Sequence, residues 1–462
     1  MPSKRPVLDV AIIGGGVTGA SIGRELSRYR LKIALFEKEE ELAFGVSKSN
    51  SGIIHPGTQN PPGSLKGRLC VEGNRLTREI ARELGVEYKE VGELIVIFSS
   101  SEMPRLMKIK EDAEKLGVSG MSIVDRDWLK EHEPNLNPET VAALYAPQAG
   151  IISPYRWVYD LAGNAASNGL QIFLSTAVTG IKKNGGAFEI VTNKKTYSAK
   201  FVVNAAGLFA DDVARMVGVS DFLIKPRKGQ EFLLDKKREN ITNHLIFPLP
   251  SATSKGILVI KTADGNPMIG PTAEDIDDKH DLSTTDEGLR TVLESVKKLV
   301  PSIEENDIIS YFAGLRPVAG TDFIIRHEDS VPGFINAAGI QSPGLSAAPA
   351  IALMVAGLLK ENGLPMRKKL FFNRKGRGKL PRTGEVVCRC ENIFAGEVRD
   401  AIRRGARTLD GIKFRTRAQA GRCHGGFCTT RIMKIMEEEL GVSAAEITKR
   451  GRGSEIINDE RA

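Results

Sequence analysis

The residues closest to the N-terminus constrain the fold more than any other part of the chain. Residues 7–13, VLDVAII, form an apolar run typical of a buried parallel strand, and the glycine-rich GGGVTG follows at 14–19. The next segment, SIGRELSRYR, has helical character, and LKIALFEK at 31–38 predicts a second strand. Strand, helix and strand in this order predict a β-α-β unit, with the glycine-rich turn at the start of the helix.

The glycines of this turn match the G-x-G-x-x-G pattern of dinucleotide-binding folds, with Gly14, Gly16 and Gly19 at the three fixed positions. The first allows a tight turn, the second a close approach to a pyrophosphate, and the third close packing of helix on strand. Free N–H groups and the dipole at the helix N-terminus favour phosphates. Glu37, 23 residues after Gly14, is expected to accept the ribose hydroxyls, which disfavours a 2′-phosphate. The motif alone does not separate FAD from NAD.

The composition fits a globular protein of more than one domain. At 462 residues the chain exceeds one ordinary core, and its 41% hydrophobic and 26% charged residues are typical of soluble domains. Part of the net charge of +8 lies in NRKGRGKLPRTG at 373–384, which indicates a solvated linker first and a patch for anions or an acidic partner second. No basic face is interleaved with aromatic residues, so a nucleic-acid partner is not expected.

Neither apolar segment that could meet a membrane predicts a span. Lys4 and Arg5 before an apolar run mimic a secretory signal, but Asp9 interrupts that run. The apolar stretch AAPAIALMVAGLL, 347–359, has thirteen residues, too few for a bilayer, and predicts a buried helix. We expect a cytoplasmic protein that is not itself transmembrane, either free or held at the inner membrane face by a partner. A disulfide framework is not expected in that compartment.

Four of the five cysteines lie in roughly the last eighty residues, as Cys388, Cys390, Cys423 and Cys428. Their spacing is C-x-C, 32 residues, then C-x4-C. Zinc sites usually use C-x2-4-C pairs, so C-x-C fits zinc poorly, and disulfides or unligated thiols are a further alternative. Four thiolates are the usual ligand set of a 2Fe–2S cluster, which this pattern favours. The fifth cysteine, Cys70, is expected to be a buried apolar thiol.

The loop SKSNSGIIHPGTQNPPGSLKGRLCVEGN, 47–74, places small hydroxyl residues near His55 in a segment rich in glycine and proline. Its pattern S-G-I-I-H-x-G followed by P-G-S-L-K resembles the FAD-dependent amine and hydroxyacid oxidase superfamily. It is most similar to the branch that holds glycerol-3-phosphate dehydrogenases and oxidases and L-2-hydroxyglutarate dehydrogenases. FVVNAAGLFADDVA, 201–214, resembles the strand and turn that close the flavin domain of this family.

Three later segments extend the resemblance to about residue 360. KGILVIKTADGNPMIGPTAE, 255–274, resembles the substrate-domain hairpin, and YFAGLRPVAG, 311–320, carries an arginine where the family grips its anionic substrate. FINAAGIQSPGLSAAPAIA, 334–352, resembles the last flavin-contact loop and the helix whose N-terminus points at the flavin ring. Besides the phosphate loop and Glu37, the resemblance implies flavin contacts at Ser47, Ser49, Asn50, Ser51, Val178, Ala206, Gly207, Gly314, Gly339, Gln341, Ser342, Gly344 and Leu345.

The resemblance implies a mixed architecture, α/β together with α+β. A discontinuous Rossmann-like FAD-binding domain is joined to an antiparallel-sheet substrate domain, and a small 2Fe–2S domain follows. The expected bounds within residues 1–372 are about 1–80, 150–220 and 320–372 for the FAD domain and about 81–149 and 221–319 for the substrate domain. The basic linker at 373–384, the 2Fe–2S domain at 385–450 and a tail without structural pattern at 451–462 complete the chain.

The segment EVVCRCENIFAGEVRDAIRRGARTLDGIKFRTRAQAGRCHGGFC resembles the 2Fe–2S domain of the bacterioferritin-associated-ferredoxin type. Gly425 and Gly426 would let the backbone approach the cluster, with N–H groups directed at sulfur. His424 lies inside the second loop and is expected near the cluster or exposed rather than as a ligand. The anaerobic type of glycerol-3-phosphate dehydrogenase carries such a module, which implies single-electron transfer to an acceptor protein or a quinone-linked subunit.

The implied reaction oxidises sn-glycerol 3-phosphate to dihydroxyacetone phosphate, with hydride transfer to flavin N5. His55 is the expected general base because an ordinary imidazole pKa near 6.5 suits that role, although it could instead only bond the flavin or the backbone. Arg316 is expected to hold the phosphate in a charge-assisted fork, with a structural ion pair as the alternative. Further substrate contacts are expected at Ser51, Ser342, Lys255 and Lys261, and the sequence does not rank the two lysines.

Two rival functions remain open at this level. The first is oxidation of an L-2-hydroxy acid such as 2-hydroxyglutarate, or of an amino acid, with a carboxylate in place of the phosphate. The second is an electron-transfer subunit whose own pocket is catalytically silent. Two or more cations around the anion would favour phosphate, because a carboxylate needs only the arginine. His55 and Arg316 in one pocket would argue against a silent subunit.

Overall fold

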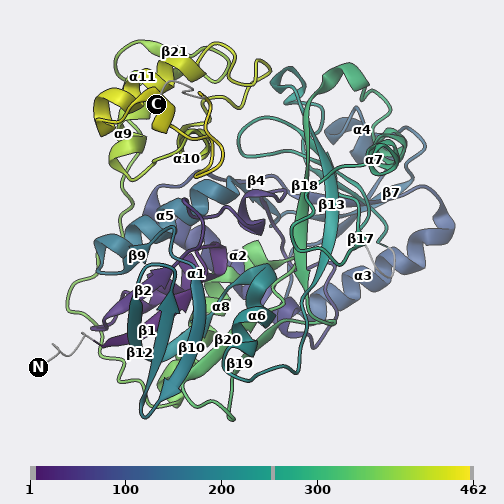
Figure 1. Ribbon diagram of the computed structural model, residues 1–462. Coiled ribbons are helices and arrows are strands. Elements are labelled where there is room, and N and C mark those ends of the chain that lie inside the picture. Colours follow the sequence, from purple (N-terminus) through teal and green to yellow (C-terminus); the bar gives the residue numbers. More distant parts are fainter. Residues whose placement is uncertain (1–6, 251–254, 458–462) are drawn as a thin grey trace, which may run out of the picture.

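The predicted β-α-β unit is present and lies at the centre of the first of two large sheets (Figure 1). The computed structural model describes residues 7–250 and 255–457. Strand β1 (Leu8–Ile13) pairs in parallel with β2 (Ile33–Phe36) on one side and β12 (Thr196–Asn204) on the other, and helix α1 (Val17–Leu26) connects β1 to β2. Because β1 is covered on both faces beyond Asp9, residues 10–13 form a continuous apolar run rather than an alternating one.

The first sheet gathers strands from three distant parts of the chain. Its strand order is β10-β11-β12-β1-β2-β9, with β20 parallel to β12 and β19 antiparallel to β20. The additional strands are β9 (Gln171–Phe173), β10 (Val178–Asn184), β11 (Ala187–Thr192), β19 (Ile324–His327) and β20 (Phe334–Ala338). The other helices of this part are α2 (Leu65–Leu84), α5 (Pro154–Ser167), α6 (Ala210–Arg215) and α8 (Gly344–Glu361). A Cβ on Gly73 would lie 2.1 Å from the Ser346 carbonyl oxygen, so α2 and α8 pack backbone to backbone.

The second sheet is mostly antiparallel, in the order β17-β13-β16-β15-β14-β5-β7-β6, with β18 paired along β13. Among the described strands of this sheet, β14 and β5 are the one neighbouring pair that runs parallel. Its strands are β5 (Glu93–Ile97), β6 (Ser122–Asp125), β7 (Ala142–Ala146), β13 (Lys225–Leu234), β14 (Leu245–Pro248), β15 (Leu258–Ile260), β16 (Met268–Gly270), β17 (Glu274–Asp275) and β18 (Ile308–Val318). The associated helices are α3 (Met103–Lys115), α4 (Arg126–His132) and α7 (Asp286–Leu299). The predicted hairpin at 255–274 is the β15–β16 pair.

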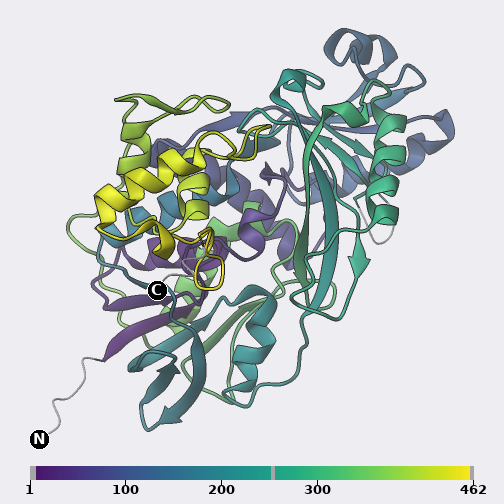
Figure 2. The same cartoon turned by 45° about the horizontal axis from the view of Figure 1, so that its top comes forward.

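A small C-terminal unit has its own hydrophobic core and lies over α5 (yellow in Figures 1 and 2). It contains β21 (Val386–Cys388), β22 (Ile393–Phe394), α9 (Ala395–Arg403), α10 (Leu409–Thr416) and α11 (Thr429–Leu440). A Cβ on Gly411 would lie 2.0 Å from Glu41 Oε1, so α10 sits directly against the loop that follows β2. Together with the two large sheets, this unit confirms the predicted fold class.

Short elements complete the described chain. A three-stranded sheet is formed by β3 (Ile53–Ile54), β8 (Gly150–Ile152) and β4 (Tyr88–Glu90). Single turns of 3-10 helix occupy Val46–Lys48, Ser100–Glu102, Gly207–Phe209, Lys236–Arg238, Glu305–Asp307 and Ala444–Glu446. The first of these turns belongs to the loop that precedes β3, and this loop carries the serines expected at the flavin.

The structure changes one argument about membrane contact. The apolar stretch at 347–359 belongs to α8, which has 18 residues and is, within residues 7–250 and 255–457, one helix with the length and composition of a membrane span. The expectation that the segment is too short was therefore wrong. The expectation of a buried helix is confirmed, because Ala347, Ile351 and Val355 are buried in the core with α1 and α2. Lys4 and Arg5 lie outside the described residues.

Two connecting segments are more ordered than their composition indicates. The basic linker has no helix or strand, but the Asn164 amide on α5 donates hydrogen bonds to the carbonyl oxygens of Asn373 and Lys375, at 2.9 and 3.0 Å. The start of the linker is therefore fixed to α5 rather than fully solvated. In the tail, Lys449 N–H donates to the Ser454 carbonyl oxygen, which closes a turn; residues 458–462 lie outside the described part.

Candidate active site and cluster site

The segments expected at the flavin meet at one edge of the first sheet. Gly14 follows β1, Glu37 follows β2, Ala206 follows β12 and Gly339 follows β20, and these four strands are parallel neighbours. Carboxyl ends of neighbouring parallel strands share an edge, which is where open α/β sheets bind ligands. The topology therefore brings together residues that are more than 300 positions apart in the sequence.

The glycine-rich turn leaves no room for side chains at two of its fixed positions. Gly14 has φ +109°, and a Cβ there would lie 2.3 Å from the Ala205 carbonyl oxygen. A Cβ on Gly19 would lie 2.0 Å from the Gly14 carbonyl oxygen. The turn, β12 and α1 are thus packed backbone to backbone, which is the geometry that the motif predicts.

The start of α1 is reached by a side chain from the serine-rich loop. Gly16 provides no side-chain cap, and the Val17 N–H instead donates to Ser47 Oγ at 2.9 Å. Asn50 shapes this loop from within, because its amide donates to the Ser47 carbonyl oxygen and accepts from the Gly52 N–H. The Asn50 amide is therefore engaged in the loop itself, whereas Ser47 lies at the N-terminus of the helix, where the motif predicts the pyrophosphate.

Glu37 is a half-buried carboxylate held by backbone donors. Its Oε2 accepts from the Gly15 N–H at 2.7 Å, and its Oε1 accepts from the Glu39 N–H at 2.9 Å. Burial raises the pKa of Glu37, and the two N–H groups oppose that rise. The Thr176 N–H donates to the Glu37 carbonyl oxygen, which places the start of β10, Val178, close to this strand end. The contact of Glu37 with a ribose stays a prediction.

The second sheet closes onto the same loop. A Cβ on Gly314 of β18 would lie 2.5 Å from the Ser49 carbonyl oxygen, so a side chain there would separate the two parts. Past β20, Gly339 has φ +64° and the Gln341 N–H donates to its carbonyl oxygen, which forms a tight turn into α8. The remaining positions at this edge are Ser51 and Leu345, which are half-buried, Ser342, which is exposed, Gly207, which has φ +58°, and Gly344, which is buried.

His55 lies in the buried space between the two sheets, with only 8% of its surface exposed. Its backbone N–H donates to Ser346 Oγ at 2.8 Å, and its ring nitrogen Nδ1 lies 3.8 Å from Glu93 Oε2. Burial and then the positive charge of Lys255 lower the pKa of His55 to about 4, and Glu93 opposes this. The expectation of an ordinary imidazole pKa near 6.5 was therefore wrong, because burial favours the uncharged ring. Neutral imidazole has a free acceptor nitrogen and remains competent to take a proton.

Glu93 is a site residue that the sequence patterns did not identify. It is fully buried on β5, and its Oε1 accepts a short hydrogen bond from the Thr58 hydroxyl. Its Oε2, the atom facing His55, has no hydrogen-bond partner among the described residues. The sequence did contain one signal for Glu93, since an acidic residue begins the apolar run ELIVI. Fully buried glutamates are rare, so an acid in such a run indicates a functional role. Cys70 is buried as expected, and burial raises the pKa of its thiol to about 12.

Arg316 and Lys255 bring two positive charges to this space. The Arg316 Nη2 donates to the Thr272 carbonyl oxygen at 2.6 Å, and burial lowers the pKa of Arg316. Burial also lowers the pKa of Lys255, and the charge of Arg316 adds to this effect. Lys255 acts on His55 as well, so the three side chains share one electrostatic environment.

The structure distinguishes between the two roles expected for Arg316 and between the two candidate lysines. Within residues 7–250 and 255–457, Arg316 forms no ion pair at 4.0 Å or less, which argues against a purely structural role. Lys261 is half-buried beyond the end of β15, and no described hydrogen bond or ion pair connects it to Arg316 or His55. Of the two lysines that the sequence left unranked, Lys255 is the one whose charge reaches the site.

The four cysteines converge from two loops of the C-terminal unit as two contacting pairs. Cys390 Sγ lies 3.5 Å from Cys423 Sγ, and the thiols of Cys388 and Cys428 share a hydrogen bond. The N–H groups of Gly425 and Phe427 are directed at the Cys423 sulfur. Within the described ranges no His, Cys, Asp or Glu group closes around a single ion. Two thiol pairs suit a binuclear cluster, in which two irons share four ligands.

The surroundings of these thiols are asymmetric. Cys388 and Cys428 are buried, whereas Cys390 is exposed at the surface of the unit. His424 is exposed with φ +49°, as expected for a residue that is not a ligand. Phe427, between the last two cysteines, is 75% exposed. One edge of the cluster site therefore faces outward.

Arg417 connects all three parts of the molecule and was not identified from the sequence. Its Nη1 donates to the Tyr155 hydroxyl on α5 at 3.0 Å, and its Nη2 donates to Asn266 Oδ1 in the β15–β16 hairpin at 2.7 Å. Its Nε donates to Glu391 Oε2, next to Cys390, at 3.3 Å. This half-buried guanidinium thus joins α5, the β15–β16 hairpin and a cysteine loop. A matching signal was the arginine of the T-R-A segment, whose partners the sequence does not name.

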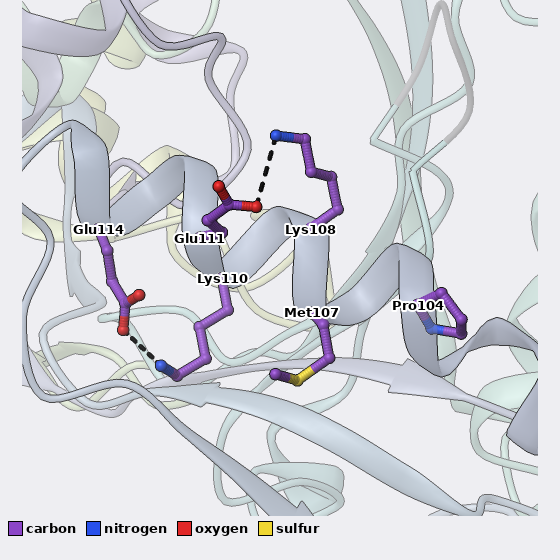
Figure 3. Close-up of a pocket in the computed structure, with 6 residues that line it drawn as sticks. All are labelled: Pro104, Met107, Lys108, Lys110, Glu111 and Glu114. Atoms are coloured by element: carbon purple, nitrogen blue, oxygen red, sulfur yellow. Dashed lines mark hydrogen bonds and ion pairs between the residues drawn. The ribbon is translucent and has the colours of Figure 1, made fainter.

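A shallow depression on α3 lies apart from these residues (Figure 3). It is lined along a single helix face, and its charges are already paired as Lys110 with Glu114 and Lys108 with Glu111. Met107 there is 48% exposed, so the depression is open to solvent. It offers no unpaired polar group to a ligand and is not assigned a role.

Comparison with known families agrees with both sites. Residues 9–358 match the family of FAD dependent oxidoreductases. The chain belongs to this family. Residues 386–438 match the BFD-like [2Fe-2S] binding domain. FAD and a 2Fe–2S cluster are therefore its cofactors, and the tight glycine turn and the paired thiols fit these two groups.

Individual relatives extend the likeness to the whole chain. The glycerol 3-phosphate dehydrogenase of Caloramator mitchellensis is 45% identical, over 98% of each chain. The structure of the FAD-bound, dithionite-reduced L-alpha-glycerophosphate oxidase of Mycoplasma pneumoniae is 33% identical, with a TM-score of 0.76, covering 80% of this chain and 98% of the other. The L-2-hydroxyglutarate dehydrogenase of Escherichia coli is 32% identical, over 57% of this chain and 64% of that one.

Proposed function

We propose that this protein oxidises sn-glycerol 3-phosphate to dihydroxyacetone phosphate and passes the electrons on through its C-terminal domain. The carrying observation is a chain of charge: the positive charge of Lys255 acts on the neutral His55, and that of Arg316 acts on Lys255. Two cations suit a phosphate, whose charge at neutral pH exceeds that of a carboxylate. The full-length likeness to a glycerol 3-phosphate dehydrogenase supports the same substrate.

Two of the side chains bind the negative charge of the substrate, and two others accept and stabilise its proton. Arg316 binds the phosphate in a charge-assisted fork, and Lys255 adds the second positive charge. His55 takes the proton of the C2 hydroxyl on its free ring nitrogen, while Glu93, 3.8 Å from its Nδ1, stabilises the imidazolium that forms. Ser51 and Ser342 are proposed to orient substrate oxygens, and Lys261 is the weaker candidate for the phosphate. Burial of His55 and Glu93 keeps water from the atoms between which the proton moves.

The two cofactors define the electron path. Bound FAD supplies an acceptor for the substrate hydride, and the cluster supplies one-electron transfer. Gly14, Gly16 and Gly19 hold the pyrophosphate against the start of α1, and Glu37 holds the ribose. The remaining flavin contacts are proposed at the residues that meet at the sheet edge described above. Cys388, Cys390, Cys423 and Cys428 hold the iron.

The rival substrates and the silent-subunit reading have less support. An amino acid with a single carboxylate needs one bidentate arginine, which leaves the charge of Lys255 without a role, and the likeness to a 2-hydroxyglutarate dehydrogenase covers a smaller share of the chain than the likeness to a glycerol 3-phosphate dehydrogenase. A silent electron-transfer subunit has no need for a buried base opposite an arginine. The proposed acceptor is a separate protein or a quinone-linked subunit that docks at the exposed Cys390 edge. A cytoplasmic position, free or beside the inner membrane face through that partner, follows from the same proposal.

The test is an anaerobic absorbance titration of the purified, cofactor-loaded protein with sn-glycerol 3-phosphate. Stoichiometric bleaching of the flavin band supports the proposal, and L-2-hydroxyglutarate and proline under the same conditions should not bleach it. If glycerol 3-phosphate leaves the band unchanged while dithionite still reduces the flavin, the substrate assignment is wrong. Bleaching by 2-hydroxyglutarate alone would transfer the assignment to that acid.

A further inference from the structure

Strands β13 and β18 build the floor of the substrate space with one face of each strand. In their antiparallel register, Arg227 pairs with Arg316, Gly229 with Gly314 and Glu231 with Phe312. Directly paired residues of antiparallel strands point to the same side of a sheet, and alternate residues share that side. These six residues therefore occupy one face.

The contacts on each side identify which face this is. On the opposite face, Gln230 Nε2 donates to Thr285 Oγ1 at the start of α7, and Phe232 packs in the core with Val292 of that helix. On the face of Glu231, Gly314 touches the Ser49 backbone of the flavin-side loop. The face that carries Arg316 and Glu231 is therefore the one that closes over the flavin site.

The two central glycines leave space that the arginine uses. A Cβ on Gly229 would lie 3.2 Å from Arg316 Nη2, so the guanidinium folds over this glycine. Glu231 is the next residue on the same face of β13, about 7 Å farther along the strand. No ion pair at 4.0 Å or less joins Glu231 to Arg316, although the positive charge of Arg316 acts on this carboxyl. The floor thus has a cation at one end and an acid at the other.

Glu231 has the features of a ligand-binding group. It is 4% exposed, and its Oε2 has no hydrogen-bond partner within residues 7–250 and 255–457. A buried carboxyl without a partner is costly, and native proteins keep such groups where a ligand completes the bond. Burial raises the pKa of Glu231 to about 7, with Arg316 opposing, so the group can donate or accept a hydrogen bond near neutrality. No motif of the sequence had singled it out.

We propose that Glu231 binds a hydroxyl group of the substrate and thereby determines specificity for a hydroxylated monophosphate over a dicarboxylate. The inference rests on the proposed function and deepens it. With the phosphate on Arg316, a hydroxyl at the far end of a short substrate bonds to the Glu231 carboxyl. A second carboxylate at that position meets like charge once Glu231 is ionised, and it gains no cation there.

The test uses 3-hydroxypropyl phosphate and propyl phosphate, two non-substrates that lack the C2 hydroxyl and differ only in the terminal hydroxyl. Their dissociation constants are read from the perturbation of the oxidised flavin band in the FAD-loaded protein at pH 8. A hydrogen bond to a charged group predicts that the native protein binds the hydroxylated compound about 10- to 100-fold more tightly. Glu231→Leu should bring this ratio close to one while leaving the affinity for propyl phosphate within about threefold.

Glu231→Gln provides a second readout, because an amide keeps a hydrogen bond but removes the charge. This variant should retain most of the hydroxyl preference and bind L-2-hydroxyglutarate at least about fivefold more tightly than the native protein does. Glu274→Gln is the matched control, since Glu274 is an exposed carboxylate beyond the substrate space, and it should change neither value.

Each outcome separates this inference from the proposed function. An unchanged ratio in a flavin-loaded Glu231→Leu protein overturns the role of Glu231. If that variant does not retain FAD, the dicarboxylate affinity of Glu231→Gln decides, and no gain there overturns the role. Failure of glycerol 3-phosphate to reduce the native flavin would remove the proposed function, whereas the ratio of the two phosphates would still report on Glu231.

Discussion

The substrate space and the cysteine site solve opposite physical problems. His55, Arg316 and Glu231 are enclosed between two sheets, and burial shifts the pKa of each toward its uncharged form. The cysteine site lies in a small unit with its own core, and Cys390 is exposed at its surface. Hydride and proton transfer benefit from exclusion of water, whereas an electron must leave at a surface that a partner can reach. The comparison indicates that the chemical step takes place in an enclosed site, whereas electrons leave the protein at an exposed one.

Loss of the 2Fe–2S cluster should have the largest effect on turnover and should leave the substrate space intact. Cys390→Ser combined with Cys423→Ser should abolish the visible absorbance of the cluster and lower turnover with a one-electron acceptor at least about 100-fold. Flavin reduction by glycerol 3-phosphate in single-turnover measurements should stay within about twofold, because the C-terminal unit has a separate core. His424→Ala is the control and should keep the cluster. Equal loss of flavin reduction would show that the two regions are not separable.

Removing the phosphate partner should have the converse effect. Arg316→Ala should lower kcat/KM about 10²- to 10³-fold, because it leaves a buried phosphate without its charge-assisted fork. Arg316→Lys should recover only part of the loss, since an ammonium cannot make the bidentate contact. The cluster absorbance should be unchanged. Arg227→Ala, on the paired strand but already bonded to Asp275, is the matched control and should cost only a few-fold in kcat/KM.

Substitution of Arg417, which connects the two regions, should have an intermediate effect on electron transfer. Arg417→Ala should slow electron transfer from reduced flavin to the cluster about tenfold, because it removes bonds to three parts of the molecule at once. Rapid-mixing absorbance separates this step from flavin reduction, which should be unaffected. Arg422→Ala removes an exposed ion pair with Asp235 in the same interface and should change little. Similar slowing in both variants would mean that Arg417 has no special position.

The smallest effect concerns pH and tests the closed character of the substrate space. The pKa of His55 is about 4 in the folded protein, below its ordinary 6.5, so the ring stays neutral as pH falls through 6.5. Its contribution to stability is present above pH 6.5 and is lost between about 6.5 and 4, because the unfolded chain binds the proton more strongly. The rate of flavin reduction at saturating substrate should show no acid limb from His55 above pH 5.

This pH profile is best measured in the Glu231→Gln background, because Glu231 itself titrates near 7. Stopped-flow absorbance between pH 5 and 8 gives the rate of flavin reduction. An acid limb centred at 6.5 in that background would show that His55 is not shielded from water, and it would weaken the contrast between the two regions.

Local patterns were sufficient for features whose partners lie within a few dozen residues. The β-α-β unit was predicted because its period, its glycines and Glu37 fall within one short segment. The set of four cysteine ligands was predicted because the spacing of the two motifs is itself the signal, whereas the contact of Cys390 with Cys423, across 33 positions, came from the structure. His55 and Arg316 were identified through resemblance rather than through spacing. The lowered pKa of His55 was missed because it depends on burial, which the ring's neighbours in sequence do not report.

By itself the sequence determined which chemistry the chain can hold: a dinucleotide turn, a histidine loop, an anion-gripping strand and four thiols. Only the tertiary structure decided which groups act together. Glu231 became a candidate because the register of β13 on β18 places it beside Arg316, and Glu93 because β5 brings it to His55. Such pairings join residues tens to hundreds of positions apart through strand register and burial, so the free energy of each charge depends on neighbours that no local pattern records.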